Sequence, residues 1–131
     1  MAQQADPARI VKDAYAGWLA TARPACTAVL ESDSEYQPIG TAQQLLVADD
    51  GGPALKFRVL AEPIIRVTAF AHGRTLARQI GAESADWIVA HRPAGIARIK
   101  NVSALLVTKD RATGAWLASF TMPVIVRPIP A

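Results

Sequence analysis

The stretch ARIKNVSALLVTKDRATGAWLASF, residues 97–120, contains two apolar segments separated by a short polar one. The separator, Arg111-Ala112-Thr113-Gly114, is about four residues long and ends in Gly, as the loops of β-hairpins often do. In the second segment, apolar side chains recur at every other residue, namely Trp116, Ala118, Phe120 and Met122. This alternation is typical of a strand with one face in the core. We therefore predict a long C-terminal hairpin in which Lys109 lies opposite Trp116.

The same pairing, extended toward the open end of the hairpin, brings basic residues together. It places Arg98 near Arg127 and Lys100 near Ile125. Like charges that face each other on a sheet are mildly destabilising unless something neutralises them, so an anion could bind there. The alternation changes phase near Asn101, which indicates a bulge that shifts the pairing by one residue.

The end of the chain carries further signals. Pro123 lacks a backbone donor, so the last strand is expected to be an edge strand or to break there. Leu105–Val107 and Val124–Val126 are apolar on both faces, so we expect the helix to cover one side and another sheet or a second copy of the chain to cover the other. The tail PVIVRPIP, residues 123–130, could be an arm that docks onto a partner subunit.

The start of the chain predicts a helix from about Pro7 to Ala22. Asp6 can cap its first amides, Pro7 suits its first position, and Pro24 stops it. Apolar residues at spacings of three and four form a stripe that consists of Ile10, Val11, Tyr15, Trp18 and Leu19.

The middle of the chain reads mainly as strands and turns. We expect strands at Ala25–Ser32, Gln43–Asp50, Leu55–Glu62 and around Ile65, Val67 and Ala69, with a loop at Asp33–Gly40 and a turn at Gly51-Gly52-Pro53. Residues 72–91 fit either strands or helix. Helix is favoured, as two short pieces in which Gly81 caps the first and Ser84 begins the second, so that Glu83 and Asp86 lie at a helix start.

These elements and the composition predict one α+β domain, residues 1–131. An N-terminal helix would pack on a mostly antiparallel sheet of about five or six strands, with a short helical insert and the C-terminal hairpin. A chain of 131 residues with 51% hydrophobic and 19% charged residues can bury one core but has little charge to cover it. Some apolar surface is therefore expected to meet another subunit.

Charge is distributed unevenly along the chain. Residues 1–50 hold three Lys/Arg against seven Asp/Glu, whereas residues 51–131 hold eleven against four, so the net charge of +3 divides into −4 and +7. The basic residues proposed to contact an anion are Arg58, Arg66, Arg98, Lys100 and Arg127. We therefore expect a non-catalytic module that binds nucleic acid or another polyanion through a basic C-terminal surface, as a homo-oligomer.

Residues for other chemistry do not fall into recognisable patterns. His72, His91 and Cys26 lack the spacing of metal ligands, and Cys26 lies in an apolar strand where it is expected to be a buried small hydrophobe. No glycine-rich phosphate loop precedes a helix. We expect no cofactor and no metal, and enzymatic activity stays open.

Two further hypotheses concern function. One is a structural protein that assembles through the C-terminal hairpin and tail. The other is a small-molecule binder or enzyme with a pocket between helix and sheet. The first helix with its tryptophan and the final hairpin, together about a third of the chain, resemble the cone-shaped α+β domains similar to nuclear transport factor 2. This resemblance implies a ligand pocket between the helix and the sheet. We assign no family on this pattern. We expect a cytoplasmic protein that does not contact membranes. The sequence has a single cysteine, shows no secretory pattern and contains no run of about 18 apolar residues.

Overall fold

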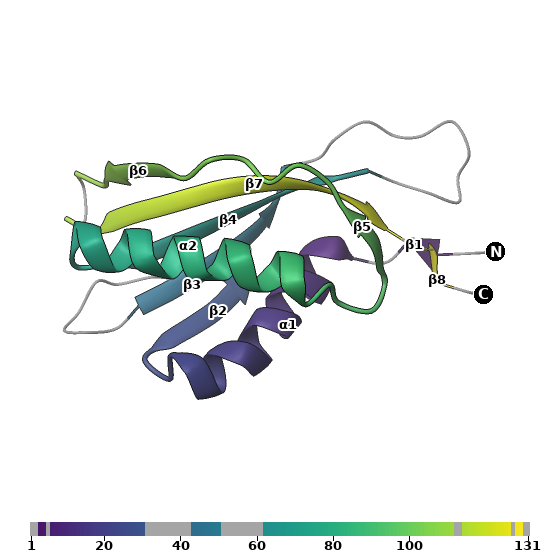
Figure 1. Ribbon diagram of the computed structural model, residues 1–131, viewed down its shortest axis with the longest axis horizontal. Helices are drawn as coiled ribbons and strands as arrows, with labels where there is room; N and C mark the ends of the chain where they lie inside the picture. The colour runs from purple at the N-terminus through teal and green to yellow at the C-terminus, as the bar shows by residue number, and fades with distance from the viewer. Residues whose placement is uncertain are drawn as a thin grey trace.

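The computed structural model describes residues 3–4, 6–30, 43–50, 62–111, 114–126 and 128–129. Two helices lie on one face of a curled mixed sheet (Figure 1). In chain order the elements are β1 (Gln3–Gln4), α1 (Pro7–Ala22), β2 (Cys26–Leu30), β3 (Gln43–Asp49), β4 (Ile64–Ala71), α2 (Arg74–Ala90), β5 (Ile96–Ile99), β6 (Leu106–Lys109), β7 (Trp116–Val126) and β8 (Pro128–Ile129). The expected α+β class is confirmed.

Helix α1 begins and ends where the sequence predicts. The Asp6 carboxylate accepts a hydrogen bond of 3.2 Å from an amide of the first turn, and Pro7 occupies the first helical position, where a missing N–H has no cost. Val11, Tyr15 and Leu19 form the buried stripe. The stripe fixes which side of α1 faces the sheet.

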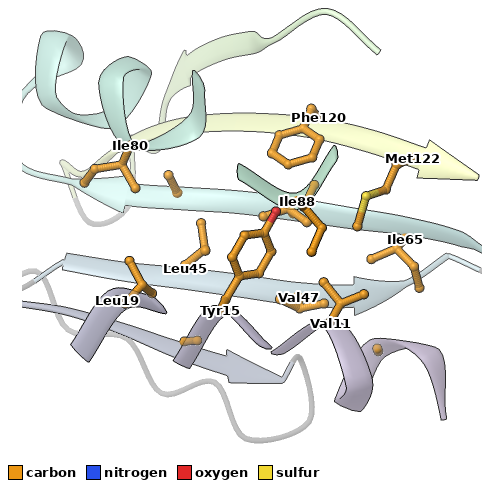
Figure 2. Packing of buried hydrophobic residues seen from close by; sticks show 14 of the residues in the cluster. Val11, Tyr15, Leu19, Leu45, Val47, Ile65, Ile80, Ile88, Phe120 and Met122 are labelled. Atoms are coloured by element: carbon orange, nitrogen blue, oxygen red, sulfur yellow. The ribbon is translucent and has the colours of Figure 1, made fainter. Parts of the chain in front are cut away.

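The main sheet has the strand order β2-β3-β4-β7-β5, and β6 also pairs with β7. Only the β2–β3 pair is parallel among the described strands, so the mostly antiparallel arrangement is confirmed. Val67 of β4 lies opposite Val47 of β3 and Phe120 of β7, and all three point toward the helices. Figure 2 shows the resulting core, in which Tyr15 reaches up between strands and α2. The sheet is therefore covered by α1 and α2 on this face.

Helix α2 is one continuous helix of 17 residues, so the preference for helix is confirmed but the predicted break into two short pieces is wrong. Gly81 and Ser84 lie in its middle and are buried. A Cβ atom at Gly81 would lie 2.9 Å from Leu105 Cδ2 and 3.1 Å from Ala118 Cβ, closer than such atoms normally approach. Gly81 thus allows α2 to pack closely against β7 and does not end the helix.

The C-terminal hairpin has the predicted register near its loop, where Lys109 pairs with Trp116. Toward the open end the register shifts: the numbers of paired residues total 225 in β6 but 223 at Arg98 and Ile99 of β5, and a further shift lies between Ile96 and Arg98. The expected irregularity is present, but it moves the pairing by two residues rather than one. As a result Arg98 lies opposite Ile125, and the predicted position opposite Arg127 is wrong.

Pro123 lies inside β7, which pairs with strands on both sides, so the predicted edge or break is wrong. The Pro123 carbonyl accepts a hydrogen bond from the Lys100 amide at 2.8 Å, so its missing N–H also points toward the β5 and β6 side. On that side residues 100–105 belong to no strand. Ser103 still holds this segment, because its amide donates to Thr121 O and its hydroxyl accepts from Thr121 N, both at 2.9 Å. The sheet therefore accommodates the proline by interrupting the neighbouring ladder.

The final residues do not form the predicted arm. Residues 123–126 belong to β7, and β8 pairs with β1 of the same chain, with Gln3 opposite Ile129. The predicted loop at Asp33–Gly40, the turn at Gly51-Gly52-Pro53 and the strand at Leu55–Glu62, apart from Glu62 itself, lie outside the described residues.

Candidate interaction surface

The face of the main sheet that points away from α1 and α2, here called the outer face, carries an apolar patch. The members of the patch lie in two neighbouring rows across the sheet: Val29, Leu46 and Leu106 in one row and Leu117 in the next. Leu106 is 67% exposed and the other three are half-buried. Both described helices lie on the opposite side of the sheet (Figure 1). No described helix or strand therefore covers the patch.

The alternation in β7 explains how this patch arises. Its even-numbered residues from Ala118 to Val126 are buried against the helices, and the odd-numbered ones from Leu117 to Ile125 are half-buried on the outer face. Several of the odd-numbered residues are themselves apolar. The expectation that this hairpin is apolar on both faces is confirmed, whereas the second covering partner stays a prediction.

Three of the five predicted anion-binding residues fall within the described chain: Arg66, Arg98 and Lys100. Arg58 and Arg127 lie outside it. Arg66 lies opposite Thr121 and Arg98 opposite Ile125, so both backbones occupy outer-face positions near the same end of β7. Lys100 follows β5 at that end. The fold thus brings the three described residues to one end of the sheet.

Two of these three cations are already paired with carboxylates. Arg66 Nη2 lies 2.8 Å from Asp50 Oδ2, and Lys100 Nζ lies 2.6 Å from Glu62 Oε1. Both acidic residues come directly beside strand ends, Asp50 after β3 and Glu62 before β4. Three positive and two negative charges leave a local net charge of +1. Such a surface attracts a polyanion much less than five unpaired cations would.

A further ion pair joins the two helices on the other side of the sheet. Arg23, the C-cap of α1, donates to Glu83 of α2 through Nε at 3.0 Å and through Nη2 at 2.8 Å. These hydrogen bonds lower the pKa of the Glu83 carboxyl and raise that of the Arg23 guanidinium. Glu83 and Asp86 lie within α2 and not at a helix start, so that prediction is wrong. The partners are 60 positions apart in the sequence, so no local pattern could predict this pair.

Aromatic rings stack between the ends of the helices. The rings of Trp18 and Trp87 have centroids 5.1 Å apart and are inclined by 14°, and the His91 ring stacks on Trp87 with a centroid distance of 5.0 Å. Each such contact adds about 0.5–1.5 kcal/mol beyond the area it buries. Trp18 and Trp87 are half-buried, so they act as core residues at the rim of the helix layer.

Reactive groups are placed as structural residues. Cys26 is buried, and burial raises the pKa of its thiol to about 11, so it is a poor nucleophile near neutral pH. His72 and His91 lie at the ends of α2 and are exposed. In the described ranges no three His, Cys, Asp or Glu side chains gather in a way that could hold a metal ion. Neither α1 nor α2 has the combination of length and apolar character that a membrane-crossing helix needs.

Comparison with known proteins gives no assignment: no model of a protein family matches this sequence, and no curated protein is significantly similar to it.

Proposed function

We propose that this protein is a non-catalytic assembly module that associates with a second copy of itself through the outer face of its sheet. The observation that carries the proposal is the apolar patch, above all Leu106, which is 67% exposed on a hairpin that has its other face in the core. Val29 and Leu46 are neighbours on β2 and β3, and Leu106 of β6 is diagonal to Leu117 of β7. Thr68 and Ser119 separate Leu46 from Leu106 within their row, and half-buried Phe70 of β4, which lies opposite Leu117, links the two pairs. Contiguous apolar surface of this kind marks interaction sites on soluble proteins.

The size of the outer face limits the interface that it can form. Five strands at a spacing of about 4.8 Å and a length of about 26 Å, that of the eight residues of β4, give a face of roughly 600 Å². A stable complex buries about 800 Å² on each partner, which exceeds this flat area, so the whole outer face and its charged rim would have to take part. Sheets that pack face to face do so at a distance of about 10 Å, with their strands inclined by about 30°.

The charges at one end of the face fit a rim around such an interface. The Arg66–Asp50 and Lys100–Glu62 pairs are partly exposed and nearly balanced. Polar, compensated rims around an apolar centre are usual where two proteins meet. A nucleic-acid site instead needs cations that are free to contact phosphates, and here two of the three described ones would first have to leave a carboxylate.

The oligomeric state tests the proposal. Sedimentation velocity between about 1 µM and about 500 µM is expected to show a dimer, because interfaces with a small apolar centre typically bind in the micromolar range. Leu106→Glu, a change at an exposed position that leaves the monomer core intact, is expected to weaken association at least tenfold. Thr75→Glu in the exposed first turn of α2 adds the same charge on the helix layer and is expected to have no effect on association. A wild-type chain that stays monomeric throughout would refute the proposal.

Contact with nucleic acid and a cytoplasmic location stay predictions. The cheapest measurement of the first is retention on single-stranded and double-stranded DNA at about 50 mM salt, where contacts to phosphates are strong. Arg66→Gln should weaken such retention if that surface is used. No retention at this salt concentration would eliminate the nucleic-acid hypothesis and leave the assembly proposal unaffected.

A further inference from the structure

The chain reverses sharply between α2 and β5 and forms a small hollow there. Helix α2 ends at Ala90, and the left-handed backbone of Gly95, with φ of +96°, lets β5 begin at Ile96. A hollow of about 370 Å³ opens at this reversal, lined by Val89, Ala90, Arg92, Arg98 and Ile99. It lies beside the edge strand β5, away from the apolar patch.

Two guanidinium groups border this hollow. The Arg92 side chain is held in place, since its Nη1 donates to the Ala97 carbonyl at 2.6 Å, and a guanidinium has further N–H donors to offer. Within the described ranges neither Arg92 nor Arg98 forms an ion pair, and no acidic residue lines the hollow. The nearest charged neighbour along β5, Lys100, is also positive and binds Glu62. The hollow is therefore positively charged.

The remaining lining is apolar. Val89 is 57% exposed, and Ile99 and Ala90 complete the lining. Pockets that bind small molecules typically measure about 300–1,000 Å³ and combine apolar walls with a few polar groups that orient the ligand. In volume this hollow is at the small end of that range, and it is shallow, because Val89, Ala90, Arg92 and Arg98 are all exposed, so a ligand would rest on it without being enclosed.

We propose that this hollow binds a small organic carboxylate whose apolar group rests on Val89 and Ile99. A carboxylate matches the planar fork of a guanidinium and can be shared between Arg92 and Arg98. A bare inorganic anion would use the arginines but not the apolar lining, and an apolar cation would be repelled. The arrangement thus selects for both parts of the ligand. The hollow lies outside the apolar patch, and Arg98 is the residue that it shares with the end of the outer face.

Titration with hexanoate tests this site. In ¹⁵N NMR spectra, hexanoate is expected to shift the amides of Val89 and Ile99 and the side-chain Nε–H signals of Arg92 and Arg98, with a Kd of about 1 mM. Acetate and inorganic phosphate, which lack the apolar group, should bind at least fivefold more weakly, and hexylammonium should not shift these signals.

Two variants identify the groups involved. Arg98→Gln is expected to raise the Kd for hexanoate about tenfold, as the loss of one charge-assisted hydrogen-bonding group does. Arg74→Gln, which removes an exposed arginine at the other end of α2, should leave the Kd unchanged. The proposal is overturned if hexanoate causes no shifts up to about 20 mM, if phosphate or hexylammonium gives the same response, or if Arg98→Gln binds as the wild type does. These outcomes do not depend on the oligomeric state, provided that both proteins are compared at one concentration.

Discussion

The closeness of α2 to β7 can be measured with a pair of glycine substitutions. Gly17 of α1 and Gly81 of α2 both lie inside helices, where replacing Gly by Ala gains about 1 kcal/mol of helix propensity. Nothing lies within 4 Å of a Cβ atom built at Gly17. Gly17→Ala should therefore stabilise the protein by about 0.5–1 kcal/mol.

Gly81→Ala has the same gain in helix propensity, but a steric cost opposes it. The new methyl group would lie 2.9 Å from Leu105 Cδ2 and 3.1 Å from Ala118 Cβ. The Leu105 side chain is half-buried and can move, whereas Ala118 belongs to the central strand and cannot move without disturbing the core. Overpacking of a tight core costs about 1–3 kcal/mol, so we expect a net destabilisation of about 1 kcal/mol.

Urea unfolding followed by circular dichroism measures both variants. The slope of the unfolding free energy against urea should stay constant, so that changes in midpoint report stability. Ala118→Gly removes one of the two contacted atoms, and in the double variant Gly81→Ala/Ala118→Gly the cost of the new methyl group should shrink measurably. If Gly81→Ala stabilises the protein as much as Gly17→Ala does, α2 does not approach β7 this closely and the reasoning is refuted.

Two predictions concern pH. Arg23 lowers the pKa of the Glu83 carboxyl, so this pair stabilises the fold above the ordinary pKa of a carboxyl, and the stabilisation is lost as the pH falls through the lowered pKa. Upon acidification the wild type should lose up to about 1 kcal/mol more unfolding free energy than Glu83→Gln; the effect is modest because Glu83 is 40% exposed, and equal losses would contradict a stabilising role of the pair. Burial raises the pKa of Cys26 from 9.0 to about 11, so the unfolded chain ionises first and stability falls as the pH rises through this interval. At pH 11 the wild type should have lost about 2 kcal/mol more unfolding free energy than Cys26→Ala, as measured by urea unfolding. If the stability of the two proteins falls in parallel with pH, the thiol is not buried.

Local signals were sufficient for much of the fold. The capping residue Asp6, the proline after it and the spacing of Val11, Tyr15 and Leu19 all lie within α1 itself, so the helix could be placed to the residue. The alternation in β4 and β7 likewise predicted their buried faces. Such features depend only on neighbours in the sequence.

The wrong predictions arose at positions where the same residue type can occur for two different structural reasons. A glycine or serine can end or begin a helix, but Gly81 is small because β7 packs against it. Ser84 is buried in the middle of the helix, where Tyr15 Oη donates a hydrogen bond of 2.9 Å to its backbone carbonyl. Pro123 can mark an edge, but here the strand beside it is interrupted instead. Sequence alone does not distinguish these cases, since the deciding contacts are with distant segments.

The candidate site was predicted in part for the same reason. The exposure of Arg66 followed from the alternation in β4. Its partner Asp50 and the Glu62 that binds Lys100 could not be foreseen, because they reach these cations only when strand ends come together in the sheet. Charge counted along the sequence therefore overstated the charge that the folded surface presents.

The interruption beside Pro123 also bears on how molecules of this protein can meet. A long, regular border strand offers a continuous row of amides and carbonyls that a stray chain can extend, and this is a common start of aggregation. Here that border consists of two strands of four residues, β5 and β6, separated by a stretch pinned through Ser103. Growth by adding strands at this border is thereby discouraged, so the self-association proposed above would rely on a broad face, where a defined stoichiometry is easier to achieve.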